Sequence, residues 1–231
     1  TEKYRAAEDL KVSLEDGAVL VRCDKGSFRF FYDFNMEPKD DCYTPVPLFH
    51  WQAQPKYLQL RGLIDRGMVE PALAMRIHHM VSHDAFTRTL KDIVVFEANL
   101  FEFIPRSTID HVFADFSGMV YTNCIMSTKN NLKASMELGF LPDGSEPVLL
   151  HEVVARSGIA SDLPVDIQTV QYPIYVFKGE KTETYNEIDY ELYGMNNTEA
   201  DCIRFILWAL TDSTRIQQLQ ADYAHLEKVW E

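Results

Sequence analysis

The segment DIVVFEANLFEFI, residues 92–104, constrains the fold of this chain more than any other stretch. Branched and aromatic side chains dominate it, and these residue types are enriched in β-strands. A run that is apolar on both faces suits a strand covered on both sides. We therefore predict a central strand over residues 92–104. Glu97 and Glu102 are five residues apart, so a regular strand would point them to opposite faces.

Further segments supply the elements around this strand. Asp24-Lys25-Gly26 is turn chemistry between the β-rich runs GAVLVRC and SFRFFYDF, which predicts a hairpin, and the proline-rich stretch 35–49 predicts a loop. The remaining predicted strands are 119–126, 147–155 and 170–177; the predicted helices are 2–14, 56–67, 70–90 and 127–140, with a short helix-like stretch at 107–116. The result is an α/β fold, with α+β as the alternative, built on a mixed central sheet flanked by helices.

The C-terminal part of the chain predicts a helical hairpin. Thr198 can cap a first helix, and a second begins near Asp212 or Ser213. The apolar residues of the second helix repeat at steps of three and four, which makes a narrow seam: Ile216, Leu219, Tyr223, Leu226 and Trp230. Either the preceding helix or a second subunit can cover that seam, so a homo-oligomer through this helix is one alternative. We expect one domain over residues 1–178, with an acidic segment and the helical hairpin, 179–231, packed on it.

Composition excludes several classes of protein. Of the 231 residues 46% are hydrophobic, which argues against wholesale disorder, and the formal net charge of −13 argues against generic nucleic-acid binding. The four cysteines have no paired spacing, so neither a zinc ribbon nor a disulfide scaffold is predicted. No apolar run is long enough to cross a membrane, and the charged N-terminus does not read as a signal peptide. We expect a cytoplasmic protein.

The stretch STKNNLKASMELGF, residues 127–140, carries a resemblance to a known family. It follows the predicted strand 119–126, begins its helical run near Asn130 or Asn131 and ends in Leu-Gly-Phe, where Gly139 can end a helix with a positive φ. Over residues 92–155 the predicted order of strands and helices resembles the core of the Gcn5-related N-acetyltransferases (GNAT). This resemblance implies a GNAT-like core and an acyltransferase that moves an acyl group from acetyl-CoA or another acyl-CoA to an amine.

The resemblance also implies site residues. Arg106, Ser107 and Thr108 follow the predicted central strand, where the family binds the cofactor pyrophosphate, and Asn130 or Asn131 would contact the cofactor arm. Glu97 or Glu102 would act as the general base or orient a water molecule, and Tyr121 on the next strand would face the same cleft. The negative charge of the chain then favours a cationic or amine-bearing acceptor.

Two departures from the family pattern support a rival hypothesis. The stretch IPRSTIDHV has no glycine where the family has a glycine-rich loop, and Ser135 stands where a tyrosine is common. The rival is a noncatalytic interaction protein with a degenerate GNAT-like fold that docks partners through its acidic segment and terminal helix.

The stretch RIHHMVSHD is a weaker candidate for a metal site. His79 and His83 are four residues apart, which on a helix places both rings on one face at metal-binding distance. A third ligand would have to come from elsewhere, such as His50, His111, His151 or an acid. Ordinary hydrogen-bonded histidines are the alternative, and we assign no metal.

Overall fold

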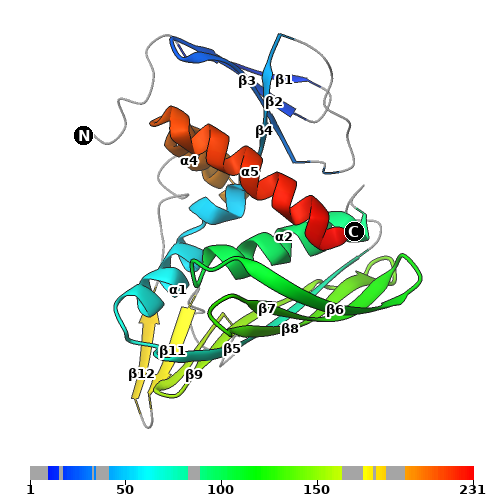
Figure 1. Cartoon of the computed structure of the whole chain (residues 1–231), viewed down its shortest axis with the longest axis vertical. Helices are drawn as coiled ribbons and strands as arrows, with labels where there is room; N and C mark the ends of the chain where they lie inside the picture. The colour runs from blue at the N-terminus through cyan, green and yellow to red at the C-terminus, as the bar shows by residue number, and fades with distance from the viewer. Residues whose placement is uncertain are drawn as a thin grey trace. The chain divides into compact units, whose positions relative to one another are not determined.

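A computed structural model describes residues 10–15, 18–32, 34, 42–82, 89–162, 174–178, 181–185 and 196–231. The chain forms two compact units (Figure 1). The terminal unit consists of Thr1–Gln54 and Asp189–Glu231, and the central unit of Pro55–Ile188. The predicted division of the chain after residue 178 remains a prediction.

The terminal unit contains a four-stranded sheet. Its strands are β1 (Lys11–Glu15), β2 (Ala18–Cys23), β3 (Gly26–Phe31) and β4 (Thr44–Pro47), in that order, with β3 and β4 parallel. The predicted hairpin is confirmed, since β2 and β3 pair antiparallel around the turn that ends at Gly26. The predicted helix 2–14 is wrong for residues 11–14, which pair with β2, while residues 2–9 lie outside the described part. The predicted loop 35–49 contains β4.

Two predicted C-terminal helices are confirmed in this unit. These are α4 (Asn197–Ala209) and α5 (Ser213–Trp230). The unit also contains the short 3-10 helix η2 (His50–Ala53), which lies much earlier in the chain. Asn196, rather than Thr198, caps α4 by accepting a hydrogen bond from the Glu199 backbone amide. In the seam of α5, Ile216, Leu219 and Leu226 are buried. Tyr223 packs edge-to-face on Phe31 with ring centroids 5.3 Å apart.

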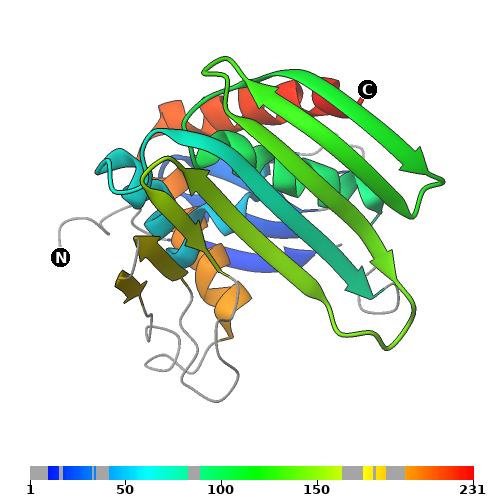
Figure 2. The ribbon, with the colours of Figure 1, turned by 90° about the horizontal axis from the view of Figure 1, so that it is seen from below.

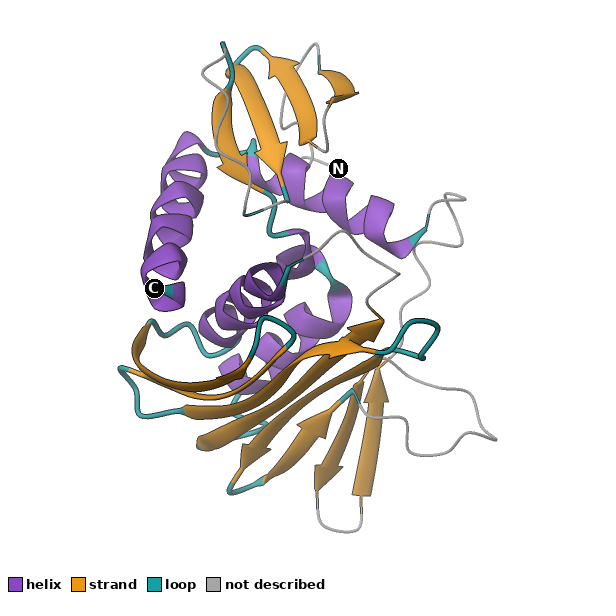
Figure 3. Ribbon diagram, turned by 90° about the vertical axis from the view of Figure 1, so that its right-hand side faces the viewer, coloured by secondary structure: helices purple, strands orange, loops and turns teal. Residues whose placement is uncertain are grey.

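The central unit is built on an eight-stranded sheet (Figure 2). Its strands follow the order β12-β11-β10-β9-β5-β8-β7-β6, and all neighbours are antiparallel except β5 and β8. Figure 3 shows these strands as one twisted layer. Their bounds are β5 Ala72–Ser82, β6 Ile109–Ser117, β7 Tyr121–Thr128, β8 Lys133–Leu141, β9 Val148–Ala155, β10 Gly158–Ser161, β11 Ile174–Lys178 and β12 Lys181–Tyr185. The predicted mixed α/β fold class is confirmed, as are the strands 119–126 and 147–155 and the described end of 170–177.

Among its described residues, the central unit contains the helices α1 (Pro55–Asp65), which confirms the helix predicted at 56–67, and α2 (Leu90–Phe103). The strand predicted over residues 92–104 is wrong, because this segment is α2. The helix begins at a capping arrangement in which the Asp92 carboxylate accepts a hydrogen bond from the Thr89 backbone amide at 2.7 Å. Most residues of α2 are buried, on nearly every side of the helix. Its sequence therefore lacks the alternation of apolar and polar residues that would distinguish a helix from a strand.

The helix predicted over residues 70–90 is also wrong, since β5 occupies its first part. Met75, Ile77, His79 and Val81 are buried, whereas the residues between them are exposed or half-buried. This alternation with period two marks a strand that has one face against the core. β5 pairs with β8 on one side and β9 on the other and so lies in the middle of the sheet.

The stretch 127–140, on which the family resemblance depended, does not form a helix. Most of it belongs to β8, and the helix-like stretch 107–116 becomes β6. Gly139 does not end a helix; it lies in β8, where an added Cβ would come within 2.5 Å of the Val120 carbonyl oxygen. The glycine is required by the close approach of another backbone segment, whose Val120 carbonyl accepts a hydrogen bond from the Phe140 amide at 2.9 Å.

Candidate functional site

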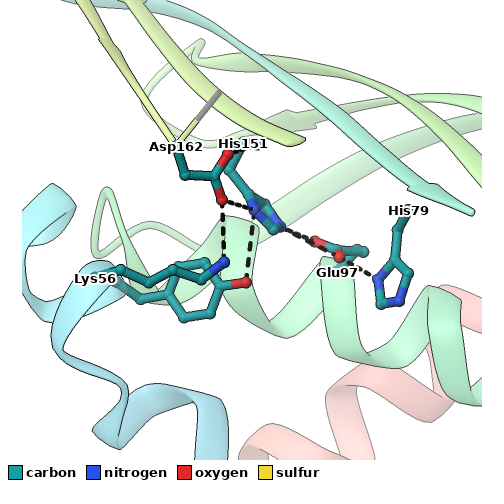
Figure 4. A network of polar contacts seen from close by, with 6 residues as sticks. Lys56, His79, Glu97, His151 and Asp162 are labelled. Atoms are coloured by element: carbon teal, nitrogen blue, oxygen red, sulfur yellow. Dashed lines mark hydrogen bonds and ion pairs between the residues drawn. The ribbon is translucent and has the colours of Figure 1, made fainter. Parts of the chain in front are cut away.

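A row of ionisable side chains crosses the interior of the central unit (Figure 4). His79 comes from β5, Glu97 from the middle of α2 and His151 from β9. Asp162 directly follows β10, and Lys56 lies in the first turn of α1. We call these five side chains the buried charge row.

Strand register explains why the two histidines face the same helix. His151 pairs with Ile77 across β5 and β9, so His79 is its diagonal neighbour on the same face of the sheet. Glu97 reaches this face from α2, and its side chain is 0% exposed. The carboxylate lies between the two rings, 2.6 Å from His79 Nδ1 and 3.2 Å from His151 Nε2.

His151 has a carboxylate at each ring nitrogen. Its Nε2 faces Glu97, and its Nδ1 lies 2.8 Å from Asp162 Oδ2. Both ring nitrogens can be donors only when the imidazole carries two protons. The geometry therefore assigns His151 as an imidazolium held between two ionised carboxylates.

Asp162 connects this interior to the outer end of the row. One carboxylate oxygen accepts a hydrogen bond from the His151 backbone amide at 2.6 Å, and the other takes an ion pair from Lys56 Nζ at 3.0 Å. The Lys56 side chain is 21% exposed, whereas that of Asp162 is 5% exposed. Lys56 also lies over the ring of Tyr57, with Nζ 4.6 Å from the centroid. The row thus runs from a partly accessible ammonium to a buried imidazole.

The ionisation of the row follows from these contacts. Burial alone would raise the pKa of Glu97, but His151 and His79 outweigh it and hold that pKa at about 2. Burial likewise disfavours the cationic form of His151, yet Glu97 and Asp162 raise its pKa to about 9. For Asp162, burial is outweighed by His151 and then Lys56, which lower the pKa to about 2. The negative charges of Glu97 and Asp162 are thus matched by the positive charges of His151 and Lys56, which offsets the cost of burying charged groups.

This arrangement holds a proton on His151 and orients the Lys56 ammonium through direct side-chain contacts. Each step along Lys56, Asp162, His151, Glu97 and His79 joins a donor to an acceptor. The exposed end could exchange a proton with a molecule at the surface of α1. Chemistry that releases or takes up a proton at an oxygen atom suits such a row.

The structure brings together only part of the predicted site. Glu97 and His79 belong to the row, but Glu102 does not: its carboxylate accepts a hydrogen bond from the Ile109 backbone amide at 2.7 Å and so ties β6 to α2. Tyr121 begins β7 on the face opposite Thr122 and Cys124, which are buried. It therefore lies on the other side of the sheet from Glu97.

The predicted pyrophosphate site is a helix end. Arg106 has φ 53°, and the Ser107 amide donates to the Glu102 carbonyl, a hydrogen-bond pattern typical of a Schellman-type C-terminus. The C-terminal end of α2 carries the negative pole of the helix dipole and repels phosphate. Arg106 instead pairs with Asp65 at 2.6 Å, and the Thr108 carbonyl accepts from the Lys129 amide.

Asn130 and Asn131 lie in the turn between β7 and β8. Asn131 has φ 60°, and its amide donates to the Thr128 carbonyl at 2.8 Å. Both residues serve a tight connection between two strands rather than the start of a helix.

No group of three or more histidine, cysteine, aspartate or glutamate side chains in the described part of the chain could hold a metal ion. His79 is engaged by Glu97, and His83 lies outside the described residues. Among the helices that the structure describes, none is long and apolar enough to cross a membrane.

Sequence reasoning missed Lys56 and Asp162, and it considered His151 only as a metal ligand. Asp162 lies beyond a four-residue strand, and nothing in its local sequence indicates a buried carboxylate. One signal was present: a glutamate inside the apolar run 92–104 needs a buried partner if it is ionised.

Comparisons with known proteins identify the fold. No family model matches this chain, and no curated protein matches its sequence. Solved structures do match. An inositol dehydrogenase homolog from Azotobacter vinelandii, complexed with NADH and myo-inositol, is 11% identical with a TM-score of 0.59, over 81% of this chain and 60% of that one.

Two further structures give the same result. A 3-ketoreductase from Actinomadura kijaniata in complex with NADP is 13% identical, with a TM-score of 0.57, over 80% of this chain and 58% of that one. An oxidoreductase from Agrobacterium radiobacter, in complex with NAD+, L-tartaric acid and magnesium, is 10% identical, with a TM-score of 0.58, over 80% and 60%. The chain therefore spans about three fifths of the length of these proteins.

These comparisons correct the family prediction. The predicted GNAT core, the CoA-dependent acyltransferase, its degenerate noncatalytic form and the acyl-CoA cofactor are wrong, because the matching structures are oxidoreductases bound to nicotinamide cofactors. The resemblance to the GNAT core fails because three of its predicted elements have the wrong type. Residues 92–104 form a helix instead of the central strand, and residues 107–116 and 127–140 form strands instead of helices. Over about four fifths of its length, this chain shares its fold with part of these oxidoreductases.

Proposed function

We propose that this chain is a nicotinamide-dependent oxidoreductase, or the sheet-bearing part of one, that acts on a hydroxyl or keto group of a small polyhydroxylated molecule. The observation that carries the proposal is the fold shared with oxidoreductases complexed with NADH, NADP, myo-inositol or L-tartaric acid. A cytoplasmic location is part of the proposal, since these cofactors are abundant there.

No described residue is assigned to the dinucleotide. A dinucleotide pyrophosphate is usually held where a strand passes through a glycine-rich turn into the N-terminus of a helix. In the part of the chain that the structure describes, no strand enters a helix through such a turn. The described residues therefore do not form such a dinucleotide site.

The buried charge row supplies the proton chemistry that the proposed reaction needs. Interconverting a secondary alcohol and a ketone adds or removes one proton at the oxygen, and that proton must come from or go to a positioned group. Lys56 is the accessible end of the row, and Asp162 holds its ammonium at 3.0 Å. We assign Lys56 the contact with the substrate oxygen, and Asp162, His151 and Glu97 the positioning of Lys56.

The proposal is tested by incubating the purified chain with NAD+ or NADP+ and a panel of inositols, aldonic acids and hydroxy acids, and recording the absorbance of reduced nicotinamide. Binding of NADH and NADPH is measured separately by the fluorescence of the reduced ring. If the purified chain binds NADH or NADPH, we expect turnover with at least one polyhydroxylated substrate.

Lys56→Met tests the assigned residue, with Lys133→Met, an exposed lysine of β8, as the matched control. Losing a proton-transferring group should lower kcat/KM by about 10²-fold or more, and the control should not change it. The absence of both cofactor binding and turnover would refute the proposed function. Turnover that is equal in the two variants would refute the role of Lys56 alone.

A further inference from the structure

Strand β6 is a long, apolar edge of the large sheet. It pairs with β7 on one side, and in the described part of the chain it is the last strand in the sheet order. It contains nine residues, and Phe113 at its centre is 72% exposed. One row of backbone N–H and C=O groups on such an edge is available to a further strand.

Sheet edges of this kind are usually protected in monomeric proteins. A lysine or proline on the strand, or a very short strand, prevents unwanted pairing. β6, with the sequence IDHVFADFS, has no lysine and no proline and is longer than a typical strand. Its exposed apolar residues also include Val112, at 41%. A register shift between Ile109 and His111 marks the start of the strand, so the edge from His111 onward has the properties of a pairing site.

The order of side chains on β6 identifies the partner. His111, Phe113 and Asp115 alternate along the strand and share one face, opposite Ser127, Ile125 and Asn123 of β7. An antiparallel pairing of two copies centred on Phe113 places Phe113 opposite Phe113. The same register places His111 of each copy opposite Asp115 of the other, so one apolar pair is flanked by two His–Asp pairs in which a ring N–H can donate to the carboxylate.

His111 is suited to such a contact. Its side chain is 82% exposed, and among the described residues its Nδ1 lies 3.0 Å from the Asp110 carboxylate. The Nε2 side of the ring remains for the Asp115 carboxylate of a second copy. Opposite charges and aromatic pairs directly across antiparallel strands are favourable contacts, whereas like charges there are unfavourable.

We propose that β6 is a self-association surface: two copies of this chain pair their β6 strands antiparallel in the register centred on Phe113, and join their large sheets into one. This inference does not depend on the proposed enzymatic function, since it uses only the edge strand and its side chains.

Charge reversal tests the register. The full chain is examined by size-exclusion chromatography with light scattering over a range of concentrations. His111→Asp places two aspartates opposite each other at both flanks, and should weaken the dimer about tenfold or more. The double variant His111→Asp, Asp115→Lys places opposite charges at the same two positions and should restore the dimer. Circular dichroism verifies that each variant is folded.

Val148→Asp is the matched control, because Val148 is an exposed apolar residue of β9, away from the β6 edge. It should leave the dimer unchanged. Phe113→Lys is a second test that can be used if the His111 and Asp115 variants fold poorly. It adds a charge at the centre of the edge and should also give a monomer. A monomeric wild-type chain, a dimer unaffected by His111→Asp, no rescue in the double variant, or a dimer lost only in Val148→Asp would each overturn the proposal.

Discussion

Glu97→Gln removes one negative charge from the buried charge row with little change in shape. In the wild-type protein the pKa of Glu97 falls from its ordinary value of 4.5 to about 2. Each unit of pKa corresponds to about 1.4 kcal/mol, so this lowering of the Glu97 pKa corresponds to about 3 kcal/mol of stabilisation of the folded protein at neutral pH. The rise of the His151 pKa from 6.5 to about 9 reflects largely the same attraction, so the two values are not added.

We therefore expect Glu97→Gln to lower the free energy of unfolding by about 3 kcal/mol, within the range for breaking a buried ion pair. Native domains are stable by about 5–15 kcal/mol, so the variant should fold but be strongly destabilised. Urea unfolding followed by circular dichroism measures the change. Glu102→Gln, in the same helix but bonded to a backbone amide, is the control and should cost about 1 kcal/mol.

The pH dependence has a definite sign. Because the folded pKa of Glu97 is lowered, its contribution is present above about 4.5 and is lost as the pH falls toward 2. The folded pKa of His151 is raised, so its contribution is present below 6.5 and is lost as the pH rises toward 9. Stability should be greatest between these limits, and Glu97→Gln should reduce the alkaline loss. Equal destabilisation by the two variants, with an unchanged alkaline loss, would refute this reasoning.

Three further predictions concern other parts of the chain. Gly139→Ala brings a Cβ against the Val120 carbonyl oxygen and should lower the free energy of unfolding by about 1–3 kcal/mol. In the control, Gly62→Ala in α1, the new Cβ meets the end of the flexible Arg66 side chain, so this variant should be neutral or slightly stabilising. Thermal unfolding of the two variants measures the difference. Burial, with a smaller effect from Glu97, raises the pKa of the Cys124 thiol to about 12. An alkylating reagent should therefore modify the exposed Cys42 first and leave Cys124 unmodified until the protein unfolds, which mass spectrometry can follow. Lys56→Met should lower stability by about 1 kcal/mol or less, because its ion pair is partly exposed; a loss as large as that of Glu97→Gln would make Lys56 structural.

The sequence predicts the elements whose local signals agree with their surroundings. The β2–β3 hairpin has turn residues between two β-rich runs, and α5 has both its N-terminal Asp212 cap and a regular apolar repeat. For α2, β-branched residues favour a strand, and burial on nearly every side removes the periodicity that would identify a helix. For β5, the alternation is present in the sequence, but Pro71 also suits the first turn of a helix and so favours the helical prediction.

The buried charge row could be predicted only in part. Glu97 stands out as an acid within an apolar run, whereas its partners come from segments far apart in the chain, β5, β9 and the end of β10. Nothing local to His151 or Asp162 indicates that they meet, because strand order in the sheet decides it. The expected cationic acceptor and the oligomer through the C-terminal helix remain predictions.

The state of His151 is the central physical claim about the site, and nuclear magnetic resonance of the labelled imidazole measures it directly. We expect a doubly protonated ring at neutral pH with a pKa of about 9, because Nδ1 and Nε2 both face carboxylates. The Glu97→Gln variant should lower that pKa. A neutral ring at pH 7, or a pKa at or below the ordinary histidine value of about 6.5, would contradict the ionised row and the proton chemistry proposed for it.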